Sequence, residues 1–168
     1  QDSLFLFFEE YDQHEKKGHI AALAFDERGP SGPPIRVLET AGHLSYPFVF
    51  SYRDDLYMLP ESSDQATVDL YRCTHFPDRW TYDRTLLKGI KAVDTTLCHH
   101  EGLWWLFTCI AAHPQSPARD ELFLFYADSP LSEEWTPHPL NPVISDVRHA
   151  RPAGRIIQQD RRILRPAQ

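Results

Sequence analysis

Apolar and polar residues alternate in short blocks along this chain, and four blocks share one pattern, an apolar stretch that ends in polar residues. These blocks are LFLFFEEYD from Leu4, LYMLPESS from Leu56, LWWLFTCI from Leu103 and RRILRPAQ from Arg161. The last three each follow another stretch with strand character, at 45–50, 94–99 and 151–157. Turn-forming residues at 53–55, 100–102 and 159–160 separate the two stretches of each pair. The pattern therefore predicts three β-hairpins.

The repeat extends beyond the hairpins. Apolar stretches at 67–73 and 121–127 predict third strands, and each leads to a Trp-Thr pair where a fourth strand begins, at Trp80 and Trp135. In the first module, third and fourth strands are expected at 18–26 and 35–39. Proline-rich stretches at 28–34 and 114–117 predict exposed loops. No segment shows capped 3.6-residue periodicity, so very little helix is expected.

Recurring four-stranded modules are typical of β-propeller blades. Tyr46, Asp94 and Arg151 open successive first strands, 48 and 57 residues apart. The chain is therefore expected to be an all-β propeller domain, with complete four-stranded blades at 43–88 and 92–144 and incomplete ones at 1–40 and 149–168. A β-sandwich need not repeat as a block, and β-helix repeats are much shorter. Because a propeller closes with at least four blades, we expect residues 1–168 to be a fragment of a longer protein or a piece whose partner strands come from elsewhere.

Composition excludes several functions. The net charge is −7 and no basic stripe is present, so no nucleic-acid partner is expected. No apolar run is long enough to span a membrane, and no signal segment opens the chain, which favours a cytoplasmic location. Because the chain starts at Gln1 inside a repeat, a targeting segment could lie outside it. The three cysteines lack metal or disulfide spacing, and the oligomeric state is undetermined.

Propeller geometry predicts where chemistry gathers. The start of each first strand and the end of the antiparallel second strand meet at one mouth of the central channel. The candidate catalytic residues there are Asp94 and Glu61, and the candidate substrate-binding residues are Tyr46, Arg151, Arg165, Glu10, His43 and Thr95. Asp94 lies between residues expected to be buried, so its carboxylate requires partners. Charged residues at hairpin ends are also often simply solvated, and ligand binding and structural ion pairing both fit the two arginines.

Two carboxylates across a channel mouth fit glycoside hydrolysis, which needs one proton donor and one ionised base or nucleophile. The nine histidines are scattered without a ligand motif, so no metal is expected. No glycine-rich phosphate loop occurs, and no cofactor is expected. Trp104 and Trp105 point to opposite faces of one strand; at least one belongs to the core, and the other is a candidate platform for stacking a sugar.

Long motifs support a family resemblance. The series HLSYPFVF, LYMLPESS, FPDRW, AVDTTL, LWWLFT and SPLSEEWTPHPLNPV, followed by ARPAGRI and RPAQ, covers nearly the whole chain. It resembles the propeller of bacterial formyltransferase-like proteins and the N-terminal domain of plant glucosamine inositolphosphorylceramide transferases. That domain is similar to the five-bladed propellers of glycoside hydrolase families 43 and 32. The resemblance, and not the repeat itself, predicts that the complete propeller has five blades.

The resemblance implies a carbohydrate or sugar-containing small molecule as the partner. In the hydrolases, aspartates open two blades and a third blade supplies a glutamate acid. Here Asp94 matches a blade-opening aspartate, whereas Tyr46 and Arg151 stand at the equivalent places and Glu61 ends a second strand. We expect a glycosidase-like hydrolase with Asp94 ionised and Glu61 as proton donor. The alternative is a non-catalytic domain, attached to a formyltransferase or glycosyltransferase, that binds a glycan or acceptor, including one that carries phosphate or carboxylate. A WD40-type protein scaffold is less favoured because the G-H…W-D spacing is absent.

Overall fold

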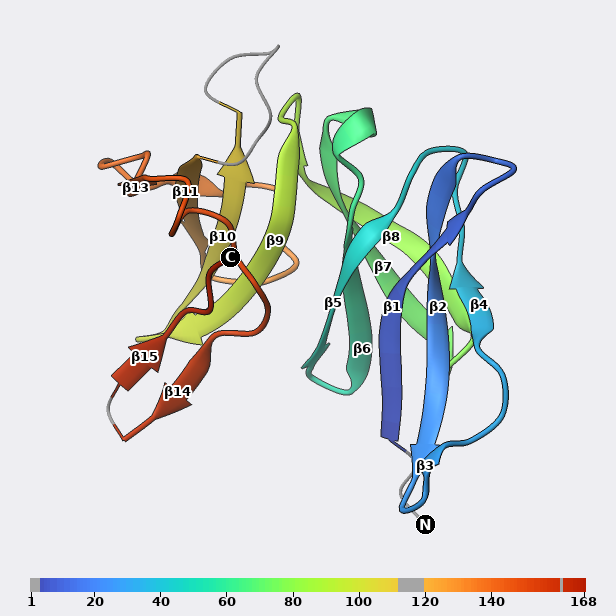
Figure 1. The fold of residues 1–168 in the computed structure, drawn as a ribbon. Coiled ribbons are helices and arrows are strands. Elements are labelled where there is room, and N and C mark those ends of the chain that lie inside the picture. Colours follow the sequence, from blue (N-terminus) through green and yellow to red (C-terminus); the bar gives the residue numbers. More distant parts are fainter. Residues whose placement is uncertain (1–3, 112–119, 161) are drawn as a thin grey trace.

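The computed structural model describes residues 4–111, 120–160 and 162–168, and its regular elements are strands apart from one 3₁₀ turn, η1 (Ser63–Gln65). Four antiparallel sheets lie side by side (Figure 1). The first contains β1 (Leu4–Asp12), β2 (Lys17–Asp26), β3 (Gly29–Pro30) and β4 (Ile35–Leu38); the second contains β5 (Ser45–Tyr52), β6 (Asp55–Glu61), β7 (Thr67–His75) and β8 (Arg79–Lys88). The third contains β9 (Ala92–His100), β10 (Leu103–Ile110), β11 (Glu121–Ala127), β12 (Thr136–Pro137) and β13 (Ile144–Ser145), and the fourth pairs β14 (Ile157–Gln159) with β15 (Arg162–Leu164). The all-β fold of a partial propeller is confirmed.

The three predicted hairpins are present. They join β5 to β6, β9 to β10 and β14 to β15, and Arg53, Glu101 and Asp160 occupy equivalent turn positions with φ near 54°, 50° and 48°. Two-residue hairpin turns need positive φ at their first central residue because only that backbone matches the twist of the strands. The same local geometry therefore recurs in three modules.

The repeated tryptophans also occupy equivalent environments. Trp80 Nε1 donates to the Pro77 carbonyl at 2.8 Å, and Trp135 Nε1 donates to the Ser132 carbonyl at 2.8 Å, each three residues back. Trp80 lies in β8, a ten-residue strand, whereas Trp135 precedes the two-residue strand β12. The fourth strand is therefore long in the second sheet and short in the third.

The last module differs from its prediction. A first strand was expected at 151–157, but regular pairing occurs only between β14 and β15, and an isolated bridge joins Pro152 to Ala167. Pro152 lacks an amide hydrogen and Gly154 has φ of 125°, so neither sustains a β-ladder. Of the two predicted loops, residues 114–117 lie outside the described residues, and 28–34 contains the short strand β3.

The core lies between the sheets. Ile20 and Ala22 of the first sheet pack with Met58 and Trp80 of the second, whereas other apolar residues of the second sheet pack with Leu106 of the third. Strand β5 contacts both β1 and β9, so the strands at the inner edges adjoin one another (Figure 1). Among the described residues, no helix has the length and apolar character needed to cross a bilayer.

Candidate functional site

The same backbone irregularity occurs near the start of β5 and of β9. In each strand, the pairing register slips by one residue, between Ser45 and Phe48 in β5 and between Val93 and Thr96 in β9. Tyr46 (φ 44°) and Asp94 (φ 53°) lie inside these two bulges. Positive φ is strained for residues with a side chain, and bulges re-aim side chains beside functional sites. Equivalent strained positions in two blades thus carry different side chains, a tyrosine and an aspartate.

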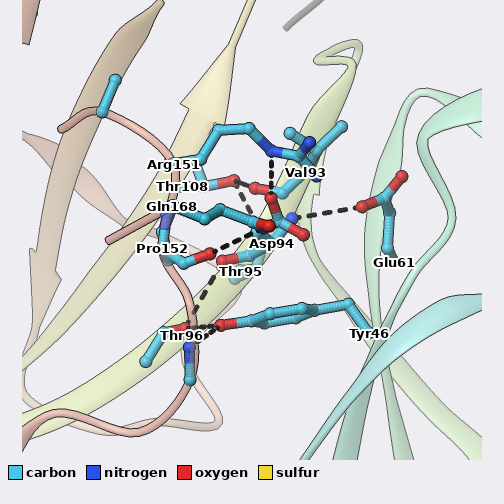
Figure 2. Close-up of polar contacts among 12 residues, drawn as sticks. Tyr46, Glu61, Val93, Asp94, Thr95, Thr96, Thr108, Arg151, Pro152 and Gln168 are labelled. Atoms are coloured by element: carbon cyan, nitrogen blue, oxygen red, sulfur yellow. Dashed lines mark hydrogen bonds and ion pairs between the residues drawn. The ribbon is translucent and has the colours of Figure 1, made fainter. Parts of the chain in front are cut away.

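Asp94 lies at the centre of the site (Figure 2). Arg151 donates from Nε to Asp94 Oδ2 at 2.6 Å, and the exposed fractions of the two side chains are 30% and 3%. The backbone amide of Asp94 donates to Glu61 Oε2 at 3.3 Å. The Asp94 carboxylate raises the pKa of the Arg151 guanidinium above its ordinary value, so Arg151 stays charged. The structure therefore brings together three of the predicted residues, from β6, β9 and the segment before β14.

Tyr46 links the second sheet to the third sheet and to the C-terminal segment. The backbone amide of Gly154 donates to Tyr46 Oη at 2.7 Å, and Tyr46 Oη lies 3.0 Å from Thr96 Oγ1. Thr96 in turn donates to the Asp94 carbonyl at 3.4 Å. Burial is the largest cause that raises the Tyr46 pKa, so the hydroxyl remains protonated. These bonds indicate that Tyr46, which was predicted to bind substrate, fixes the geometry around Asp94.

Thr95 and Arg165, two residues predicted to bind substrate, form hydrogen bonds within the protein. The Thr95 side chain is buried, and its hydroxyl bonds to Thr108 Oγ1, which donates to the Val93 carbonyl. Arg165 donates to the backbone carbonyls of His149, Ala150 and Pro166. Burial lowers the pKa of Arg165. Both side chains thus bond to protein groups beside Asp94 and Arg151.

Glu10 and His43 make contacts of their own within and beside the first sheet. Glu10 Oε2 lies 2.8 Å from Nε2 of the buried His19. His43 Nδ1 accepts from the Gly18 amide at 2.8 Å, and His43 Nε2 lies 3.4 Å from Glu9 Oε1. These contacts join β1, β2 and the approach to β5, and they are separate from the contacts of Asp94.

The pairing register identifies a position that sequence reasoning did not consider. Ser45 pairs with Glu61 in the second sheet, and Val93 pairs with Cys109 in the third, so Glu61 and Cys109 are equivalent. Cys109 is fully buried and packs against Leu122 and Ala150. Comparing the two bulged strands residue by residue would have found this pair. The equivalent position carries a carboxylate in one sheet and a buried thiol in the next.

Cys109 should react slowly with alkylating agents, because burial raises its thiol pKa to about 11. At pH 9 an ordinary thiol is about three quarters ionised, whereas a pKa of about 11 leaves about 1% thiolate. We expect iodoacetamide to modify the folded protein at Cys109 at least about 50-fold more slowly than the urea-unfolded protein, measured by peptide mass spectrometry. The half-buried Cys73 serves as control. Equal alkylation rates at Cys73 and Cys109 in the folded protein would contradict the burial of the Cys109 thiol.

The side chains of the site are charged and polar. Within the described ranges, no group of three or more histidine, cysteine, aspartate or glutamate side chains is arranged to hold a metal ion. Asp94 and Glu61 are neighbours, but Arg151 occupies the space beside one Asp94 oxygen. Carboxylate and guanidinium groups offer acceptors and donors at fixed positions, which suits a ligand rich in hydroxyl groups.

Comparison with known sequences identifies relatives over the whole chain. A family model described as glucosamine inositolphosphorylceramide transferase 1, N-terminal, matches residues 1–168. Glucosamine inositolphosphorylceramide transferase 1 of Arabidopsis thaliana is 36% identical over 170 residues, which cover 99% of this chain and 22% of the relative. The Oryza sativa subsp. japonica protein of the same name is 35% identical, with 99% and 23% covered. The chain therefore spans less than a quarter of the length of these relatives.

Solved structures share the fold at low sequence identity. The xyloglucan PUL GH43B protein of Bacteroides ovatus superposes with a TM-score of 0.63 at 14% identity, covering 86% of this chain and 28% of that one. The exo-β-1,3-galactanase 1,3Gal43A of Clostridium thermocellum gives a TM-score of 0.60 at 15% identity, covering 92% and 36%. A galactanase of Phanerochaete chrysosporium, solved with β-1,3-galactotriose, gives 0.57 at 13% identity, covering 86% and 32%. The chain thus has the propeller fold of family 43 glycoside hydrolases.

Proposed function

Because the chain belongs to the family of the N-terminal domain of glucosamine inositolphosphorylceramide transferase 1, we propose that its Asp94–Arg151–Glu61 site binds a sugar-containing molecule without cleaving it. The supporting observation is the 2.6 Å bond between Arg151 Nε and Asp94 Oδ2, in which the aspartate side chain is only 3% exposed. A general base or nucleophile must reach the substrate. Asp94 instead holds Arg151 in place, and Glu61 and Arg151 contact the ligand.

The charge balance favours a neutral or amino sugar. Two carboxylates and one guanidinium make up the site, and the guanidinium is already paired with Asp94. Arg165, the other candidate for an acidic group, donates to backbone carbonyls. The relatives are named for glucosamine, whose protonated amine forms strong charge-assisted hydrogen bonds with a carboxylate. Glu61 is the carboxylate that we assign to this contact.

Titration of the protein with glucosamine and with N-acetylglucosamine, followed by NMR chemical shifts, tests the proposal. We expect glucosamine to bind more tightly, because acetylation removes the positive charge. Glu61→Gln should weaken glucosamine binding roughly tenfold, since losing a charged hydrogen bond costs about 1.5 kcal/mol. Glu101→Gln is the matched control, because that side chain is 83% exposed on a hairpin turn and should leave the affinity unchanged. Equal affinity of the Glu61→Gln protein and the unmodified protein would overturn the assignment.

A second candidate function is glycoside hydrolysis, with Asp94 ionised and Glu61 as proton donor. The observation in its favour is the 3.3 Å bond from the Asp94 amide to Glu61 Oε2, which makes the two carboxylate residues neighbours in a fold similar to family 43 glycoside hydrolases. A panel of aryl glycosides separates the two functions. Turnover that both Asp94→Asn and Glu61→Gln abolish would replace the binding proposal with the hydrolase.

The binding function fits a domain that works beside a transferase. In the relatives, about three quarters of the chain lies outside the matched region. We propose that the domain presents a sugar-containing acceptor to an attached glycosyltransferase or formyltransferase. Sequencing the neighbouring coding region identifies the attached domain; a gene that encodes neither kind of transferase would contradict this part of the proposal.

A further inference from the structure

A hollow lies farther along the same inner strands. Its volume is about 580 Å³, and its walls come from β5, β6, β9, β10, β14 and the segment that enters β14. Strand β5 runs from Tyr46 at the site to Phe48 and Phe50 in this hollow, and β9 runs from Asp94 to His99. Asp94, Glu61 and Arg151 do not line it. The hollow is therefore a separate space of the size that small-ligand pockets commonly have.

Aromatic side chains form one wall of the hollow. The half-buried Trp104 ring lies 6.0 Å from Phe50, 5.6 Å from Tyr52 and 5.2 Å from the His99 ring, measured between centroids. Its neighbour Trp105 points to the opposite face of β10, where it contacts Tyr126. Trp104 packs against the core of the second and third sheets and also lines the hollow. It is the tryptophan of the pair that the hollow offers to a ligand, because the electron-rich face of an indole attracts the C–H groups of a sugar ring.

Exposed polar side chains also line the hollow. Arg155 donates from Nη2 to the Val49 carbonyl at 2.5 Å, and its guanidinium lies 5.1 Å from the Phe48 ring centroid. One bond uses one of the five N–H groups of a guanidinium, so others remain available to a ligand. Gln158 Nε2 donates to the Cys98 sulfur and the His99 carbonyl, so its amide oxygen remains an acceptor. Among the described residues that line the hollow, Arg155 is cationic, His99 carries an imidazole, and none carries a carboxylate.

We propose that this hollow binds an acidic saccharide, a sugar that carries a carboxylate or a phosphate. The sugar ring stacks on Trp104, its acidic group receives hydrogen bonds from Arg155, and a hydroxyl donates to Gln158. Guanidinium groups suit carboxylate and phosphate because their N–H donors match two acceptor oxygens. This charge preference is opposite to that of the Asp94–Arg151–Glu61 site. The inference does not rest on the function proposed for that site.

Tryptophan fluorescence titrations with glucuronic acid, glucose 6-phosphate and glucose test the proposal. We expect one or both acidic sugars to change the emission and to bind at least roughly tenfold more tightly than glucose, because a charged hydrogen bond contributes about this factor. The two arms show whether the site prefers carboxylate or phosphate. Trp104→Phe should abolish the emission change, and the matched control Trp105→Phe should retain it. Arg155→Gln should remove the preference over glucose.

Several results would overturn the proposal. These are equal affinity for glucose and both acidic sugars, equal loss of response in the Trp104→Phe and Trp105→Phe proteins, and unchanged acid preference in the Arg155→Gln protein. Circular dichroism establishes that each variant is folded, and if Trp104→Phe fails to fold, the Arg155→Gln result decides. Glu61→Gln should leave the acidic-sugar response intact, which separates failure here from failure of the function proposed above.

Discussion

Arg151→Ala should lower the free energy of unfolding by about 3 kcal/mol, because it leaves the Asp94 carboxylate buried without its ion-pair partner. The Asp94 side chain is 3% exposed, and Arg151 Nε is 2.6 Å from its Oδ2. Arg151 itself is 30% exposed, and this partial exposure places the expected loss of stability at the lower end of the range for breaking a buried ion pair. Urea denaturation at pH 7 measures the change.

Arg148→Ala is the matched control for this prediction. Arg148 pairs with Asp146 at 2.8 Å, but its side chain is 78% exposed, and exposed ion pairs contribute little to stability. The double variant Asp94→Asn with Arg151→Ala should be more stable than Arg151→Ala alone, because the unpaired charge has been removed. If Arg151→Ala and Arg148→Ala had equal, small effects, Asp94 would not need Arg151 as its partner.

Gly18→Ala should destabilise the protein by about 2 kcal/mol, the typical cost of forcing extra volume into a packed site. A β-carbon at Gly18 would lie 2.5 Å from the Leu44 carbonyl oxygen and 2.8 Å from both Glu9 Oε1 and His43 Cε1. The backbone cannot readily shift, because the Gly18 carbonyl accepts from the Leu44 amide and the Gly18 amide donates to His43 Nδ1. Thermal unfolding monitored by circular dichroism measures the loss.

Gly42→Ala provides the comparison for Gly18. Its added β-carbon would lie 2.9 Å from Nε2 of Gln65, the end of a flexible side chain that can move away. We expect little change in the midpoint of thermal unfolding. If Gly18→Ala were equally neutral, the close packing of Glu9 and His43 around Gly18 would be contradicted, and His43 would become available again as a ligand-binding residue.

Most of the fold followed from the sequence because local signals repeat. The turns at Arg53, Glu101 and Asp160 each demand the same hairpin geometry, and the apolar stretches on both sides supply its strands. The prediction failed at 151–157, where Pro152 and Gly154 interrupt pairing. Apolar content alone could not show this, because a ladder also needs amide hydrogens and extended backbone.

The candidate site was predicted in part. The propeller arrangement predicted that Asp94, Glu61 and Arg151 lie close together, because the start of each first strand and the end of its antiparallel second strand meet at one mouth of the channel. The hydrogen bonds of Thr95 and Arg165 with groups of the protein did not follow. They depend on the bulge at Asp94 and on contacts with residues 149–150, and register slips leave no clear sign in the pattern of apolar and polar residues.

The sequence by itself determined the strand repeat, the hairpins and the residues that meet near the axis, because these depend on local backbone preferences and on spacing along the chain. Only the tertiary structure decided which charges pair, that Tyr46 bonds to Gly154 across 108 residues, and that Glu61 and Cys109 stand at one position in two environments. Such pairings depend on distances between separate sheets and on burial, which a linear pattern does not contain.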